Sequence, residues 1–146
     1  MRGALVAGLA VALLSGCGSA GNPASSGTHA SGPKVTLDLK GGRSDQVKAC
    51  GSSNHYTVYS SGSPIEFAGA VSPVPAGRWK VKVKLKSCRG SAFQDVQKVE
   101  ATRDKHTGAF RGTLPGLPRG TYFARAALYE NGQAVARSDK RHFAIG

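Results

Sequence analysis

Four lysines at alternating positions are the residues in this sequence best placed to do chemistry. Between Arg78 and Ser87, an apolar set alternates with a basic set that consists of Lys80, Lys82, Lys84 and Lys86. Successive residues of a β-strand point to opposite faces, so the four ammonium groups would share one face at intervals of about 6.6 to 7 Å. Like charges at this spacing repel one another and need water or an opposing anion. Together with Arg78, the four lysines form a candidate anion-binding face.

The whole chain has the same basic character. Twenty Lys and Arg residues against eight Asp and Glu residues give the 146-residue chain a formal charge of +12. Candidate partners are anionic phospholipid headgroups, phosphate-bearing wall polymers and an acidic protein surface. The alternative is a solvated face whose lysines keep a sheet soluble and discourage edge pairing. We expect no nucleic-acid partner, because no aromatic residues alternate with these lysines to stack on bases.

The sequence does not indicate catalysis. Its serines occur in linker or turn contexts, and no G-x-S-x-G motif is present. The acidic residues are scattered singly, although strands could still bring some of them together in space. His55, His106 and His142 are far apart in the sequence and form no H-x-H motif. We therefore expect no catalytic residues, no metal ion and no cofactor.

The N-terminal segment has the features of an export signal. Arg2 precedes an apolar run of eleven residues, 4–14. At 1.5 Å per residue such a helix would cover roughly 16 Å, about half of a bilayer core, which predicts a cleaved signal rather than a membrane span. The stretch Leu14-Ser15-Gly16-Cys17 resembles the lipobox of bacterial lipoprotein precursors. This resemblance covers residues 1–17 and implies that residues 1–16 are removed and that Cys17 is lipidated. The protein would then be anchored to the cell membrane and would face the outside.

A tether and one folded domain are expected after Cys17. Residues 18–33 contain no large apolar side chain, which predicts that the segment 17–33 is a lipidated cysteine followed by a disordered linker. A linker of this length would keep the domain near the membrane surface. The remaining residues, 34–146, are enough for one sandwich-sized core.

Period-two patterns dominate residues 34–146 and predict β-strands. The candidate strands lie at 35–39, 56–58, 65–71, 79–85, 110–114, 122–128, around Val135 and at 143–145. Between 93 and 101, Val96 and Val99 are out of phase, which predicts a strand with a bulge. Asn131-Gly132 is a strong signal for a β-hairpin, because both residues tolerate positive φ. Short strands separated by turns, with no crossover helices, predict an all-β fold: a single antiparallel sandwich.

Three stretches carry a resemblance to a fold family. They are Phe67-x-Gly69-x-Val71-Ser72-Pro73, Gly108-Ala109-Phe110 and Gly120-Thr121-Tyr122-Phe123-Ala124. Over residues 64–145 the chain resembles the immunoglobulin-like sandwich domains of bacterial surface proteins. The resemblance implies that the Tyr122 hydroxyl bonds back to the preceding turn and that Trp79 is the core tryptophan.

The cysteines depart from the immunoglobulin pattern, which places a disulfide between two strands of the core. Once Cys17 is lipidated, Cys50 and Cys88 remain as a pair in an oxidising compartment, and a disulfide between them is expected in preference to free thiols. Because Cys88 is out of phase with the inward residues of its strand, we expect the bridge at a sheet edge, where it would pin residues 41–53. Such a loop closure is worth on the order of 4 kcal/mol.

These features together predict a membrane-anchored surface lipoprotein that acts as a non-enzymatic binding or accessory module. Two other interpretations remain open. The protein could be a structural spacer or envelope component with no dedicated ligand, or an enzyme whose cleft the sequence does not reveal.

Overall fold

The computed structural model describes residues 32–146. The predictions for the signal segment, for Cys17 and for most of the tether lie outside these residues. The described chain forms eleven strands: β1 (Lys34–Leu39), β2 (Arg43–Ala49), β3 (Ser52–Tyr59), β4 (Ile65–Ser72), β5 (Trp79–Arg89), β6 (Ala92–Glu100), β7 (Thr102–Arg103), β8 (Ala109–Leu114), β9 (Gly120–Glu130), β10 (Gln133–Arg137) and β11 (Arg141–Ile145). Within residues 32–146, no helix is long and apolar enough to cross a membrane.

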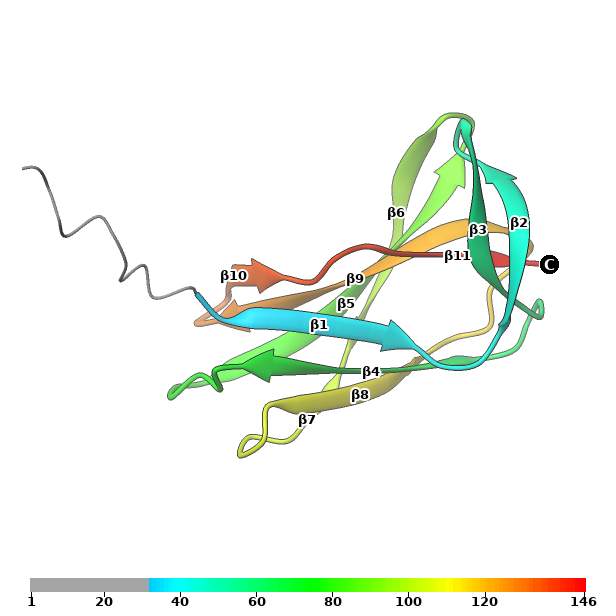
Figure 1. Ribbon diagram of the computed structural model, residues 1–146. Helices are drawn as coiled ribbons and strands as arrows, with labels where there is room; N and C mark the ends of the chain where they lie inside the picture. The colour runs from blue at the N-terminus through cyan, green and yellow to red at the C-terminus, as the bar shows by residue number, and fades with distance from the viewer. Residues whose placement is uncertain (1–31) are drawn as a thin grey trace, which may run out of the picture. The chain divides into compact units, whose positions relative to one another are not determined.

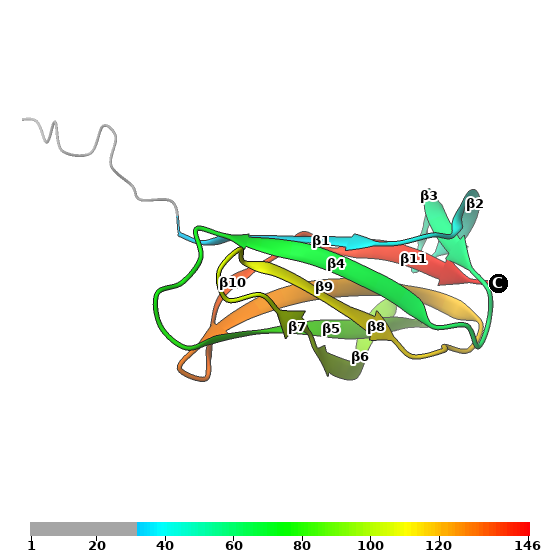
Figure 2. The same ribbon diagram turned by 90° about the horizontal axis from the view of Figure 1, so that it is seen from below.

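Two sheets pack face to face as a sandwich, which confirms the predicted all-β fold (Figure 1). The four-stranded sheet has the order β1-β4-β8-β7. The seven-stranded sheet has the order β2-β3-β11-β9-β5-β6, with β10 paired to β9. Figure 2 views the molecule from the side of the smaller sheet, with β4 and β8 in front of β9. The strand pairs are antiparallel except for β3 and β11, which run parallel with Phe143 opposite Thr57.

The core lies between the two sheets, and the predicted phases of the strands are correct. In β5 the side chains of Val81, Val83 and Leu85 are fully buried, and Trp79 is 3% exposed. They pack against inward residues of the smaller sheet such as Phe67. The lysines of β5 therefore point away from the core, onto the surface that we call the outer face of the seven-stranded sheet.

Local irregularities in the strands also match the sequence patterns. Asn131 and Gly132 adopt φ values of 50° and 82° in the turn between β9 and β10, as expected for a hairpin. Pairing of β5 with β6 shifts register between Leu85 and Lys86. Val96 is the extra residue of this bulge, and it is 44% exposed. The out-of-phase valine thus marked a real bulge.

Two strands were not predicted. The first, β2, is an edge strand whose sequence RSDQVKA has no alternation, because almost all of its described side chains are exposed. The second, β7, has only two residues and pairs with β8. Neither strand buries a full apolar face, so the period-two signal on which strand prediction depends is missing.

The predicted disulfide is present. Cys50 and Cys88 are joined, with their Cα atoms 5.8 Å apart. Cys50 lies in the turn between β2 and β3 at a φ of 46°, and the bridge ties down the 41–53 segment as expected. Cys88 is not in an edge strand, however, because β6 pairs with β5 on its far side. The bridge joins the tips of the β2–β3 and β5–β6 hairpins, which rise on the same side of β9 and β11 (Figure 1).

The expected hydrogen bond of Tyr122 is also present. Its hydroxyl donates to the carbonyl oxygen of Pro118 at 2.8 Å, back across the turn that precedes β9. Burial raises the pKa of this tyrosine, which keeps the phenol protonated as the donor. The side chain is 4% exposed and stacks on Phe143 in the core. The start of β9 is therefore held both by packing and by a directed hydrogen bond.

Candidate functional site

The lysines of β5 meet acidic residues of the neighbouring strand β6. The Nζ atoms of Lys84 and Lys86 lie 3.0 and 3.2 Å from the two carboxylate oxygens of Asp95. The Nζ atom of Lys80 lies 3.3 Å from Oε1 of Glu100. Hydrogen bonds from Lys84 and Lys86 hold the pKa of Asp95 below its usual range. The repulsion along the lysine row is therefore relieved within the protein, and these three lysines are partly neutralised.

Other strands add cations that have no such partners. Strand register places Arg125 and Lys98 on either side of Lys84, and Arg137 beside Ala127. Residues directly opposite in a ladder share a face, so all of these side chains are on the outer face. Among the described residues, Lys98, Arg125, Arg137 and Lys140 form no salt bridge. They supply positive charge that an external anion could use.

These cations surround a depression of about 420 Å³, which we call the basic hollow. Six cations line it, and Phe123, Ala127 and Tyr129 of β9 complete its wall. The cations are Lys84, Lys86, Lys98, Arg125, Arg137 and Lys140. A concave site with one sign of charge concentrates field lines more than a flat surface does. The arrangement is suited to binding a multivalent anion.

No known family and no curated protein matches this chain. Within residues 32–146, no group of three or more His, Cys, Asp or Glu side chains is arranged to hold a metal ion. The basic hollow offers ammonium and guanidinium groups, whose chemistry is recognition of carboxylate, phosphate or sulfate groups.

Arg125 is fixed in place at the basic hollow. Its Nε donates a 2.7 Å hydrogen bond to the carbonyl oxygen of Ser138. Ser138 is itself 2% exposed, and its hydroxyl accepts from the Ala126 amide at 2.9 Å and donates to the Asp139 carbonyl at 2.8 Å. An arginine held through one nitrogen loses little further freedom when its planar group meets an anion.

An aromatic cluster adjoins the basic hollow beneath the disulfide-linked hairpins. His142 lies at its centre, with ring centroids 5.8 Å from Tyr56, 5.6 Å from Phe93 and 5.4 Å from Phe123. Lys140 lies over the Phe123 ring, 5.0 Å from its centroid. Burial, together with the charge of Lys140, lowers the pKa of His142. The cluster is a second, small apolar core that supports the two hairpins from below.

A second depression lies where β5 begins. It has a volume of about 770 Å³, and we call it the tryptophan hollow because Trp79 lines it. Tyr129 lines both this hollow and the basic hollow. Its five cations are Arg78, Lys80, Lys82, Arg103 and Lys105. The Arg103 guanidinium lies 5.2 Å from the Trp79 ring, and its buried Nε has no hydrogen-bond partner in the described part of the chain.

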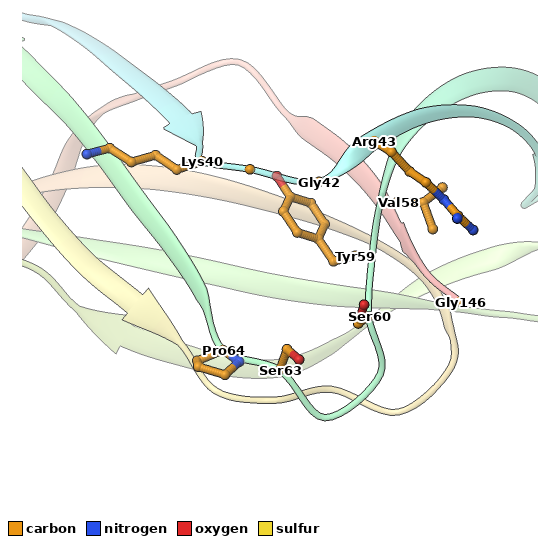
Figure 3. A pocket seen from close by; sticks show the side chains of 10 residues that line it. Lys40, Gly42, Arg43, Val58, Tyr59, Ser60, Ser63, Pro64 and Gly146 are labelled. Atoms are coloured by element: carbon orange, nitrogen blue, oxygen red, sulfur yellow. The ribbon is translucent and has the colours of Figure 1, made fainter.

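A third depression, around Tyr59, is a weaker candidate. It has a volume of about 460 Å³, and the Tyr59 hydroxyl is buried there without a hydrogen-bond partner among residues 32–146. Burial raises the pKa of this phenol. Lys40 and Arg43 line the same pocket, but their side chains extend in opposite directions away from Tyr59 (Figure 3). The two cations do not converge on one position, so the pocket does not form an anion site.

The residues of the predicted anion-binding face therefore lie in two separate hollows, and each hollow also contains cations that were not predicted. Lys84 and Lys86 line the basic hollow, whereas Arg78, Lys80 and Lys82 line the tryptophan hollow. Sequence reasoning missed the contributions of other elements, namely Lys98, Arg103, Lys105, Arg125, Arg137 and Lys140. One signal was available. In β9, Arg125 and Tyr129 of the outward set Phe123, Arg125, Ala127 and Tyr129 are partly exposed polar residues between core residues, although Phe123 and Ala127 of the same set are buried.

Proposed function

We propose that this protein is an exported, lipid-anchored module that binds an anionic component of the cell envelope through the outer face of its larger sheet. The Leu14-Ser15-Gly16-Cys17 motif supports the anchor at Cys17. The hydrogen bond from Tyr122 to Pro118 and the buried Trp79 support an immunoglobulin-like type of sandwich. The function is binding rather than catalysis.

The observation that carries this proposal is the basic hollow. Six cations from four strands and the segment between β10 and β11 converge on one depression. Among the described residues, their salt bridges go to Asp95 alone. Scattered surface lysines that serve solubility do not require such convergence. The suitable ligands are anionic phospholipid headgroups, phosphate-bearing wall polymers and an acidic protein surface. All three are accessible from a short tether at a membrane.

A structural spacer without a dedicated ligand is the second candidate function. The pairs of Lys80 with Glu100 and of Lys84 and Lys86 with Asp95 favour it, because the protein itself supplies anions for three of the β5 lysines. In that case the outer face serves to solvate the sheet. The two functions differ in what happens when the unpaired cations are removed.

The test compares two charge-matched triple variants. Lys98→Gln, Arg137→Gln and Lys140→Gln remove unpaired cations from the basic hollow. Lys34→Gln, Lys40→Gln and Lys48→Gln remove the same charge from exposed positions outside both hollows. The processed protein is held in zwitterionic nanodiscs, and its binding to isolated wall fragments and to anionic vesicles is measured at about 0.05 and 0.15 M salt.

The proposal predicts that the hollow variant loses most salt-sensitive binding and that the control variant keeps it. Equal loss in both variants would indicate nonspecific attraction to a basic protein, and no binding by the wild type would favour the spacer. The anchor is tested separately. Cys17→Ala should move the protein out of the membrane fraction, and mass spectrometry should find fatty acid on the native N-terminus. An N-terminus without fatty acid would refute the anchor.

A further inference from the structure

The basic hollow and the tryptophan hollow are neighbours with a shared wall. Tyr129 lines both depressions, and strand register places it opposite Lys80. Lys82 lies over the Tyr129 ring, with its Nζ 5.4 Å from the ring centroid. A cation therefore sits at the boundary between the hollows, and the positive charge is not interrupted there.

The charge of the two hollows forms an elongated strip, which runs along the outer face and extends through the tryptophan hollow to Arg103 of β7 in the smaller sheet. The two hollows together hold eleven of the chain's 20 Lys and Arg residues. The strip follows β5 from Lys80 to Lys86, a distance of about 20 Å at the rise of a strand. A small anion such as inorganic phosphate would occupy a fraction of this length.

Internal salt bridges leave an unpaired set in each hollow. In the described residues, Lys80, Lys84 and Lys86 are compensated by Glu100 and Asp95. The unpaired cations are Lys98, Arg125, Arg137 and Lys140 in the basic hollow, and Arg78, Lys82, Arg103 and Lys105 in the tryptophan hollow. Each hollow thus contains four cations without a salt bridge to another described residue, and one of them, Lys82, lies at the boundary between the hollows.

We propose that the two hollows form one track for a linear polyanion with phosphate groups in its backbone, laid along β5 and across Tyr129. This inference rests on the proposed function and names its ligand class. A flexible chain places successive charges in both hollows without having to match the shape of either. Each hollow also includes a guanidinium group whose Nε is buried or hydrogen-bonded: Arg103, whose buried Nε has no partner among residues 32–146, and Arg125, whose Nε is held by Ser138.

The aromatic rings of the basic hollow are covered by lysines, which favours a polymer that carries no nucleobases. Tyr129 and Phe123 are the aromatic residues lining the basic hollow, and each has a lysine ammonium over its ring, at 5.4 and 5.0 Å from the centroid. A single-stranded nucleic acid gains affinity by stacking bases on open aromatic faces. Here the rings instead hold cations where a phosphate could contact them.

The number of contacted phosphates can be read from the salt dependence of binding. Each neutralised charge of a single-stranded polyanion contributes about −0.7 to the slope of log K against log salt concentration. Eight unpaired cations predict a slope of roughly −5.6 for a chain that occupies both hollows, and about −2.8 for a chain confined to one. The two arrangements are therefore distinguishable by titration.

The experiment uses the processed full-length protein in zwitterionic nanodiscs, with linear inorganic polyphosphate as the probe. Tripolyphosphate is compared with a chain long enough to span about 20 Å. One double variant, Arg78→Gln with Lys105→Gln, removes charge from the tryptophan hollow, and another, Lys98→Gln with Arg137→Gln, removes it from the basic hollow. Lys34→Gln with Lys40→Gln is the charge-matched control. Circular dichroism and thermal melting check that each variant is folded.

We expect the long chain to bind with the steeper slope, and each hollow variant to reduce its magnitude by about 1.4 while the control leaves it unchanged. A slope near −2.8 that is the same for the wild type and for the Arg78→Gln with Lys105→Gln variant would overturn the track. The proposed function would still hold. The track alone would also be overturned if the protein binds wall fragments or anionic vesicles but not polyphosphate. Tighter binding of single-stranded DNA of equal charge would have the same consequence. If the protein binds none of these anions, both proposals are overturned.

Discussion

Removing the disulfide should destabilise the domain by a predictable amount without abolishing its fold. Cys50 and Cys88 are 38 residues apart, and closing a loop of this length restricts the unfolded chain by about 4 kcal/mol. The bridge joins two hairpin tips on the outer face and takes no part in the core between the sheets. For a domain of this size, that loss corresponds to a fall in melting temperature of roughly 15 °C.

The change is made as Cys50→Ala with Cys88→Ala in the full-length chain. Guanidinium denaturation gives the free energy of unfolding, and hydrogen exchange reports which strands lose protection. We expect the largest loss of protection in β2 and β3, since their hairpin is held at its tip by the bridge and from below by Tyr56 against His142. A loss of less than about 1 kcal/mol would show that the bridge does not constrain the unfolded chain as this reasoning requires. Reduction of the wild type should give the same result as the double substitution.

Three further predictions concern single side chains. Ser138→Ala should lower the free energy of unfolding by about 1 to 3 kcal/mol in urea titrations, because the Ala126 amide loses its buried acceptor, and an unchanged midpoint would contradict this role. The pKa of His142 is lower in the folded protein than its unfolded value of about 6.5, so the unfolded chain binds more protons. Stability should therefore fall as pH drops below that value, and His142→Phe should flatten the profile measured by thermal melting. Asp95→Asn should free Lys84 and Lys86 and steepen the salt dependence of polyphosphate binding by about 1.4, whereas an unaltered slope would mean that the two lysines do not contact the ligand.

The parts of the fold that the sequence predicted are those governed by local pattern. The alternation from Trp79 to Lys86 determined which face of β5 is buried, and Asn131-Gly132 located a hairpin. The disulfide followed from the number of cysteines and the expected compartment. These inferences need no knowledge of which strands are neighbours.

The parts that the sequence did not predict depend on strand order and register. Lys84 and Arg125 are far apart in the chain, and they share a face because β5 pairs with β9 in one particular register. The same applies to Lys98 on β6 and Arg137 on β10. A period-two pattern shows which side chains point outward, but it does not show which outward sets lie side by side.

The position of β11 constrains the order in which the larger sheet can assemble. This strand, Arg141–Ile145, lies between β3 and β9, and it is the last strand of the described chain. The β2–β3 hairpin, whose turn carries Cys50, can therefore join the rest of its sheet only after β11 is in place. Contacts this distant in sequence form late, because a large loop must close first. Until the two cysteines pair, the thiols of Cys50 and Cys88 can react with other thiols, including that of Cys17. Stable pairing of Cys50 with Cys88 is therefore expected to be a late step of oxidative folding, after β11 has docked between β3 and β9.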